Sequence, residues 1–120
     1  MSQTTLVLGA SSKPDRYSCL AIHSLVSRNH RVIAVGRREA VVNGVLIQTS
    51  IPQIIDCHTI TLYLNPSNQE VFYDQIISLV PKRIIFNPGS ENEALRILAK
   101  KNGIEVVYGC TIIMLTTGNY

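Results

Sequence analysis

Two short segments of this sequence carry residue types suited to holding a phosphorylated nucleotide. The first, Gly9-Ala10-Ser11-Ser12-Lys13-Pro14, lies between a short apolar run at 5–8 and residues that repeat at helical spacing from Tyr17 onward. At a strand-to-helix turn, backbone N–H groups and the positive end of the helix dipole favour an anion, and a glycine lets the chain approach it. The second, Gly36-Arg37-Arg38, follows the next predicted strand at 31–35. We interpret the two segments as sites for a diphosphate and a phosphorylated ribose.

Residues next to these segments strengthen the interpretation. Dinucleotide enzymes selective for NAD carry an acid after the second strand, where this chain has two arginines. A guanidinium holds a phosphate group through two parallel hydrogen bonds, and Arg16 and the hydroxyl of Ser18 can add donors to the first loop. The loop matches neither G-x-G-x-x-G nor G-x-x-x-x-G-K-[ST], which weakens an ordinary dinucleotide assignment and gives no support for nucleoside triphosphate hydrolysis.

The elements that position these segments form an alternating pattern. Five apolar runs, at 5–8, 31–35, 59–64, 83–86 and 105–107, alternate with helical patterns, which predicts an α/β fold. Their near-continuous Val, Ile and Leu content is typical of strands buried on both faces. The expected architecture is therefore one doubly wound domain over residues 1–120, with five parallel strands in the order 3-2-1-4-5 and helices on both faces.

Local signals refine this pattern. Val41-Val42-Asn43-Gly44-Val45-Leu46 predicts a two-residue hairpin in place of a full helix between the second and third strands. Two capping boxes, Ser67 with Glu70 and Ser90 with Glu93, predict the starts of the later helices. Lys100, Lys101 and Gly103 predict the end of the last of them.

Ligands of open parallel sheets bind beyond the carboxyl ends of the strands. Those ends carry turn-forming or polar residues throughout this chain, and any one such loop can serve only to turn the chain. Taken together, they give a set of candidate ligand-binding residues: Gly9, Ala10, Ser11, Ser12, Lys13, Pro14, Arg16, Tyr17, Ser18, Gly36, Arg37, Arg38, Asn65, Pro66, Asn87, Pro88 and Gly89.

These motifs resemble a known family, the small CoA-binding Rossmann-type proteins related to the CoA-binding domain of succinyl-CoA synthetase. The segment 9–18 looks like the family's G-A-S-x-x-P-x-R-x-S, and 35–38, 61–66 and 87–89 support the likeness. The resemblance covers nearly the whole chain. It implies that Ser11 to Ser18 hold the pyrophosphate of coenzyme A or an acyl-CoA, that Arg37 and Arg38 meet the phosphorylated ribose, and that Asn65 and Pro66 flank the adenine. The arginines alone do not distinguish the ribose 3′-phosphate of CoA from the neighbouring phosphate of NADP.

Composition excludes several partners and sites for this chain. The net charge of +3 is mild and aromatic residues make up 6%, so we expect no nucleic-acid partner. No apolar run reaches the roughly 18 residues of a membrane span, and the amino end lacks the basic segment of a signal peptide. Three cysteines without a C-x-x-C pair argue against a zinc site or a disulfide framework. We therefore expect a cytoplasmic protein without a metal.

Catalytic residues are hard to identify in the sequence. His23, His30 and His58 lie in separate elements and are not expected to share a site. Cys110, just after the fifth strand, either is an inert buried thiol or reacts with the CoA thiol. The predicted function is non-catalytic binding of CoA or an acyl-CoA, as a carrier, sensor or regulatory module. The alternatives are an NADP-dependent oxidoreductase and a binding protein for another nucleotide. The apolar segment 112–115 either packs on the sheet or forms a subunit contact.

Overall fold

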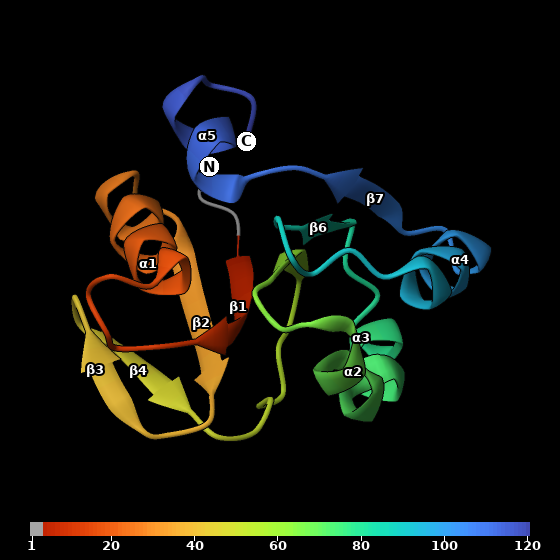
Figure 1. Cartoon of the computed structure of the whole chain (residues 1–120), viewed down its shortest axis with the longest axis horizontal. Helices are drawn as coiled ribbons and strands as arrows, with labels where there is room; N and C mark the ends of the chain where they lie inside the picture. The colour runs from red at the N-terminus through yellow and green to blue at the C-terminus, as the bar shows by residue number, and fades with distance from the viewer. Residues whose placement is uncertain (1–3) are drawn as a thin grey trace.

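The computed structural model describes residues 4–120, in which a single sheet is flanked by helices on both faces (Figure 1). The strands are β1 (Thr4–Ala10), β2 (Arg31–Gly36), β3 (Ala40–Val42), β4 (Val45–Gln48), β5 (Cys57–Leu62), β6 (Arg83–Phe86) and β7 (Glu105–Tyr108). The helices are α1 (Tyr17–Ser27), α2 (Pro66–Gln69), α3 (Tyr73–Ser78), α4 (Glu93–Lys101) and α5 (Thr111–Thr116), with a 3₁₀ turn η1 (Glu70–Phe72) between α2 and α3. None of the helices in this part of the chain is both long and apolar enough to cross a membrane.

The seven strands lie in the order β3-β4-β2-β1-β5-β6-β7. All neighbours are parallel except β3 and β4, which form an antiparallel hairpin. The predicted α/β class and all five predicted strands are confirmed, as β1, β2, β5, β6 and β7. The predicted count of five, the purely parallel sheet and the order 3-2-1-4-5 are wrong.

The hairpin accounts for the different order. Asn43 and Gly44 have φ values of 48° and 79°, the left-handed conformations that a tight two-residue turn between strands requires. The returning strand β4 then pairs with β2, through Ala34 opposite Ile47 and Val35 opposite Gln48. It thereby occupies the position beyond β2 that the prediction gave to the third main strand. That strand, β5, pairs instead with the other side of β1, so the five main strands lie in the order 2-1-3-4-5.

Alternation along β1 divides the core into two layers. Leu6 and Leu8 point into the layer covered by α3 and α4, and Val7 points into the layer covered by α1 and α5. The crossover at 49–56 has no helix, and Ile51 and Ile54 pack against the first layer in its place. Both faces of the central strands are therefore buried, as their apolar runs predict.

Two helix starts differ from the predicted capping boxes. Asn65 caps α2 by accepting from the N–H of Asn68, and Asn92 caps α4 by accepting from the N–H of Leu95. The predicted caps Ser67 and Ser90 donate their hydroxyl protons elsewhere, to Asn65 Oδ1 and to the Asn87 carbonyl. The predicted end of α4 is confirmed, because Lys100 and Lys101 occupy its last turn and Gly103 follows with φ 74°.

Candidate ligand site at the carboxyl edge of the sheet

The loops after β1, β2 and β5 meet at the carboxyl edge of the sheet. The chain leaves β1 toward α1 on one face and leaves β5 toward α2 and α3 on the other. The ends of these two adjacent strands therefore form the topological switch point, where parallel sheets bind ligands. The first loop, the Gly36-Arg37-Arg38 segment and the Asn65-Pro66 segment all lie at this edge, as the sequence predicts.

Two glycines allow the loops to come this close. A Cβ on Gly9 would lie 2.9 Å from the carbonyl carbon of Tyr63, and Gly9 has φ +98°, which other residues rarely adopt. A Cβ on Gly36 would lie 2.2 Å from the carbonyl oxygen of Ala10. The end of β1 is thus held between the ends of its two neighbours without room for a side chain at either contact.

The first loop presents unsatisfied donors at the start of α1. Arg16 is the N-cap residue, and no side chain within residues 4–120 caps this helix. The first turn contains no acidic residue, so its N–H groups and the helix dipole are left for an anion. A turn from Lys13 to Arg16 (N···O 3.0 Å) and a bond from the Lys13 N–H to Ser11 Oγ (3.1 Å) shape the loop.

The candidate residues of this loop differ in exposure. Ser12, Lys13, Pro14 and Arg16 are exposed, Ser11 is half-buried and Ser18 is buried. The ring of Tyr17 is 71% exposed, so an aromatic surface stands beside the open helix start. A large ring that the core does not bury is available to cover a bound ligand.

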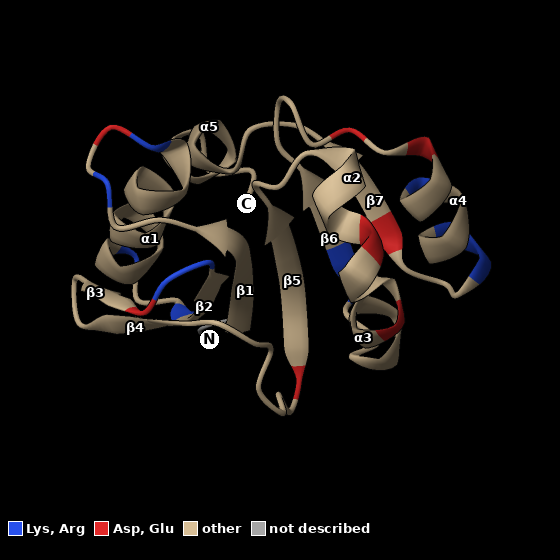
Figure 2. Ribbon diagram, turned by 60° about the horizontal axis from the view of Figure 1, so that its bottom comes forward, with Lys and Arg blue, Asp and Glu red and all other residues tan. Residues whose placement is uncertain are grey.

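Arg37 and Arg38 are exposed immediately after β2. Within residues 4–120 the one ion pair joins Glu93 and Arg96 on α4, so neither arginine is neutralised by a described carboxylate. In Figure 2 basic segments lie both in the loop before α1 and after β2. The carboxyl edge therefore carries two exposed cations after β2 and an uncapped helix start in the loop after β1.

Asn65 and Pro66 follow β5 and begin α2. Asn65 Oδ1 accepts from the Asn68 N–H (3.0 Å) and from Ser67 Oγ (2.9 Å), so its oxygen is occupied by the cap. Both residues are exposed at the switch point, and Pro66 presents a flat apolar ring. The Asn65 oxygen is therefore already satisfied, whereas the apolar ring of Pro66 is exposed and can contact a ligand.

The Asn87 side chain connects three elements inside the protein. Its Nδ2 donates to Thr61 Oγ1 (2.7 Å) and to the Leu62 carbonyl (2.9 Å), and its Oδ1 accepts from the Thr111 N–H (2.9 Å). The residue is 2% exposed. Asn87 therefore positions β5, β6 and the start of α5, whereas the next two candidates, Pro88 and Gly89, lie exposed at the edge.

Replacing Asn87 with alanine should lower the free energy of unfolding by about 2 kcal/mol, because it leaves the buried Thr111 N–H without its partner. Chemical denaturation of the variant measures this loss. Asn119→Ala is the control, because this exposed asparagine bonds only the hydroxyl of Thr117 through its side chain. Equal stability of Asn87→Ala and the unmodified chain would contradict the positioning role.

A second buried polar network was not anticipated from the sequence. Gln69 is fully buried; its Nε2 donates to the carbonyls of Leu64 (2.9 Å) and Ser90 (2.8 Å). Asn92 Nδ2 in turn donates to Gln69 Oε1 (2.9 Å) and to the Tyr73 hydroxyl (2.8 Å). This network fixes the loops after β5 and β6 beside a cavity of about 260 Å³ lined partly by Pro66 and Ser67. The one sequence signal for it was the asparagine at position 92, directly before a helix.

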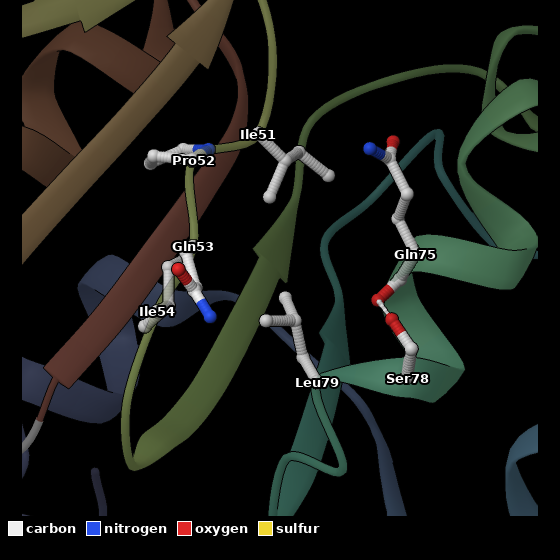
Figure 3. Close-up of a pocket in the computed structure, with 7 residues that line it drawn as sticks. All are labelled: Ile51, Pro52, Gln53, Ile54, Gln75, Ser78 and Leu79. Atoms are coloured by element: carbon white, nitrogen blue, oxygen red, sulfur yellow. Dashed lines mark hydrogen bonds between the residues drawn. The ribbon is translucent and has the colours of Figure 1, made fainter.

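A different cavity, of about 370 Å³, lies between the helix-free crossover and α3 (Figure 3). Ile51, Ile54 and Leu79 contribute apolar surface, and Gln53, Gln75 and Ser78 contribute polar groups. None of the predicted ligand-binding residues lines it. The cavity lies where the extended crossover 49–56 covers the sheet. A helix packed at the same place would fill more of this space.

Among the described residues, Tyr63 and Cys110 are the groups at the carboxyl edge that could transfer a proton or act as a nucleophile. Burial raises the pKa of Tyr63 to about 12, so its phenol stays protonated at neutral pH. Burial also raises the pKa of Cys57 to about 11, but this thiol lies at the amino end of β5, away from the carboxyl edge. Cys110 is half-buried at the N-cap of α5. Within residues 4–120 no three His, Cys, Asp or Glu side chains are grouped as metal ligands would be.

Two of the histidines lie near a half-buried arginine, Arg83, at the opposite, amino edge of the sheet. The Arg83 guanidinium lies 4.3 Å from the ring centre of Tyr120, and the His30 ring meets that same tyrosine edge-on at 5.0 Å. Arg83 Nε and His58 Nδ1 both bond Thr59 Oγ1, at 2.8 Å each. His30 and His58 thus lie close to the same arginine at the amino edge, whereas His23 is exposed on α1, and none of the three is at the carboxyl edge.

This cluster predicts a stability that depends on pH. Burial, followed by the charge of Arg83, lowers the pKa of both His30 and His58 below the ordinary value of 6.5. The unfolded chain therefore binds protons first as the pH falls, so the free energy of unfolding should be constant above about pH 6.5 and decrease below it. Denaturation titrations between about pH 5 and pH 8 measure the slope. It should diminish in the double variant His30→Gln, His58→Gln and persist in His23→Gln, and an unchanged slope in the double variant would refute the assignment.

Comparison with known proteins identifies relatives of the whole chain. The sequence model of a family described as "CoA binding domain" matches residues 3–116. No curated protein matches this chain. A solved structure described as "Crystal structure of uncharacterized protein" is 47% identical, covers 100% of this chain and 99% of its own, and has a TM-score of 0.96.

Two more distant structures share the fold. A hypothetical protein from Pyrococcus horikoshii OT3 is 21% identical, with a TM-score of 0.86 over 97% of this chain and 83% of its own. A protein from Thermus thermophilus is 20% identical, with a TM-score of 0.84 over 99% of this chain and 91% of its own. The fold is therefore found in chains that share only about a fifth of their residues with this one.

Proposed function

Since the chain belongs to the CoA-binding domain family, we propose that it binds coenzyme A or an acyl-CoA at the carboxyl edge of the sheet. The observation that carries this proposal is that an uncapped helix start after β1 and two arginines after β2 without a described carboxylate partner lie at the same carboxyl edge of the sheet, next to the switch point between β1 and β5. Coenzyme A carries a diphosphate and a ribose phosphate. A helix start suits the diphosphate, and a pair of arginines suits the ribose phosphate.

Each part of the ligand then has a defined neighbour. The diphosphate lies against the loop Ser11 to Ser18, where backbone N–H groups of the first turn of α1 donate to it. The ribose 3′-phosphate is held by Arg37 and Arg38 after β2. The adenine lies against Asn65 and Pro66, which are exposed on the other side of β1. The pantetheine arm then extends past Pro88 and Gly89 after β6, with Asn87 holding that loop from within.

The domain holds the ligand without transforming it and acts as a carrier, sensor or regulatory module. Two observations support this role. The Tyr63 phenol near the site stays protonated at neutral pH and is therefore not a general base, and His30 and His58 lie at the opposite, amino edge of the sheet. The three cysteines without a C-x-x-C pair fit a reducing compartment and support a cytoplasmic location for this function.

Thermal shift measurements with CoA, acetyl-CoA, NADP, NAD and ADP test the proposal. A ligand that binds only the folded chain stabilises it by about 3 kcal/mol when present at a hundred times its Kd. We expect a rise in melting temperature with CoA or acetyl-CoA, and a smaller rise with ADP, which lacks the ribose phosphate and the pantetheine arm. A larger rise with NADP than with either CoA ligand would instead support the oxidoreductase alternative, which the two arginines also permit.

A further inference from the structure

The cavity of about 260 Å³ at the carboxyl edge lies between the segments that follow β5 and β6. Its lining residues come from α2, η1, α3 and the start of α4: Pro66, Ser67, Glu70, Tyr73, Asn92 and Ala94. Pockets that enclose a whole small-molecule ligand usually measure about 300–1,000 Å³. This cavity therefore suits one group of a larger ligand.

The hydrogen bonds beside the cavity determine how the Tyr73 hydroxyl is used. Gln69 Nε2 faces two carbonyl oxygens, so both of its protons point there and its own oxygen faces Asn92. The Asn92 amide therefore donates one proton to Gln69 Oε1 and the other to the Tyr73 oxygen. Its own oxygen accepts the Leu95 N–H, which confirms this orientation of the amide. The Tyr73 oxygen is thus an acceptor in this network.

Of the described donors in this network, only the phenol proton of Tyr73 is left without an acceptor. Its oxygen already accepts from Asn92 at 2.8 Å, and no side chain or carbonyl within residues 4–120 accepts its proton. The residue is half-buried and lines the cavity. A hydroxyl in such a position needs an acceptor from water or from a ligand.

Glu70 adds a carboxylate to the same cavity. It lies three residues before Tyr73, begins the 3₁₀ turn η1 and is exposed. The one ion pair found between residues 4 and 120 joins Glu93 and Arg96, so no described cation neutralises Glu70. The cavity therefore presents an unused donor and an acidic acceptor from neighbouring turns of the chain.

These two groups restrict what can bind in the cavity. A phosphate would be repelled by the Glu70 carboxylate, which has the same sign of charge. An ammonium or guanidinium group has no lone pair that could accept the Tyr73 proton. A hydrocarbon chain would displace water and leave both polar groups without partners. A neutral group that carries an N–H donor beside a hydrogen-bond acceptor satisfies both.

The geometry points to this cavity as the subsite for such a neutral group, which donates an N–H to Glu70 and accepts the Tyr73 proton. The inference rests on the proposed binding of CoA or an acyl-CoA, because this ligand class carries the required chemistry in two places. One is the adenine edge, where the amino group lies beside a ring nitrogen, and the other is the pantetheine arm with its two amides. The cavity lies between Pro66 and the loop after β6, the segments assigned above to the adenine and to the arm.

Isothermal titration calorimetry of the full chain tests the subsite with CoA and with adenosine 3′-phosphate 5′-diphosphate, which is CoA without its pantetheine arm. Tyr73→Phe removes the unused donor, and Glu70→Ala removes the carboxylate. Each should weaken CoA binding about 3- to 10-fold, the effect of one lost hydrogen bond. Equal losses for both ligands would assign the cavity to the adenine, and losses for CoA alone would assign it to a pantetheine amide.

Two matched variants separate the subsite from general effects. Asp74→Ala also removes one negative charge, but this exposed residue does not line the cavity. Tyr108→Phe removes the phenol of a 49% exposed tyrosine at the end of β7. Both should bind the two ligands as the unmodified chain does. Because Tyr73→Phe also leaves an Asn92 proton without its acceptor, Glu70→Ala, which leaves that network intact, must show the loss as well.

The outcomes separate this inference from the proposed function. If the unmodified chain binds both ligands and either cavity variant binds CoA equally well, the subsite is overturned and the proposed function stands. A control variant that loses as much affinity as its cavity counterpart would overturn the subsite too, once circular dichroism has verified that each variant is folded. If the unmodified chain binds neither ligand, the proposed function itself fails, and the subsite fails with it.

Discussion

Gly36→Ala is expected to lower the free energy of unfolding by about 3 kcal/mol or more. The added Cβ would lie 2.2 Å from the Ala10 carbonyl oxygen, a backbone atom that no rotamer change can move away. To remove this clash, β1 and β2 must separate at their carboxyl ends, and the separation disrupts the buried packing on both faces of the sheet. Urea denaturation monitored by circular dichroism measures the change.

A second glycine provides the matched control for this variant. A Cβ on Gly109 would meet its nearest neighbours, Val107 Cγ1 and Met114 Sδ, at 3.5 and 3.8 Å, which are ordinary contact distances. Gly109→Ala should therefore change the free energy of unfolding by less than about 1 kcal/mol. If the two alanine variants unfold at the same urea concentration, the close contact between the first two strands is not what requires Gly36.

The double variant Arg37→Ala, Arg38→Ala should weaken CoA binding about 10- to 100-fold and leave dephospho-CoA binding nearly unchanged. In the proposed site each guanidinium donates charge-assisted hydrogen bonds to the 3′-phosphate, and dephospho-CoA lacks that group. Isothermal titration calorimetry with the two ligands separates this contact from a general effect of charge.

A charge-matched control lies at the other end of the molecule. Arg28→Ala, Arg31→Ala removes the same two charges, but both residues are exposed at the amino edge, away from the candidate site. This variant should bind both ligands as the unmodified chain does. Equal losses for CoA and dephospho-CoA in the Arg37, Arg38 variant would show that neither arginine contacts the 3′-phosphate.

The sequence predicted the elements of the fold more accurately than their arrangement. Each main strand has nearly continuous apolar residues, and the Asn43-Gly44 turn has a local conformational requirement, so both could be identified from short segments. Strand order depends on which edge a later strand pairs with. The hairpin was predicted, but its pairing with β2, which displaces β5 to the other side of β1, is a non-local contact that no short segment encodes.

The same distinction holds for side chains. The helix at Tyr17–Ser27 was predicted from its apolar spacing, but Tyr17 and Leu20 face outward while Ser18 and Cys19 are buried. Likewise, Asn87 was selected as a turn residue at the candidate site, and only the structure shows its hydrogen bonds with Thr61, Leu62 and Thr111. Residue type identified the loops of the candidate site, whereas side-chain direction depended on which partners the fold supplied.

The hairpin β3–β4 has a consequence for motion at the candidate site. Because β4 and β3 lie outside β2, local unfolding that starts at this edge of the sheet should open the hairpin before it reaches Gly36 and the arginines that follow. Arg37 and Arg38 therefore follow a strand, β2, that is paired with β4 on one side and β1 on the other. The tip at Asn43 and Gly44 is exposed, with no atom within 4 Å of a Cβ placed on Gly44, so we expect a fluorescent peptide inserted there to report ligand binding while the sheet stays intact.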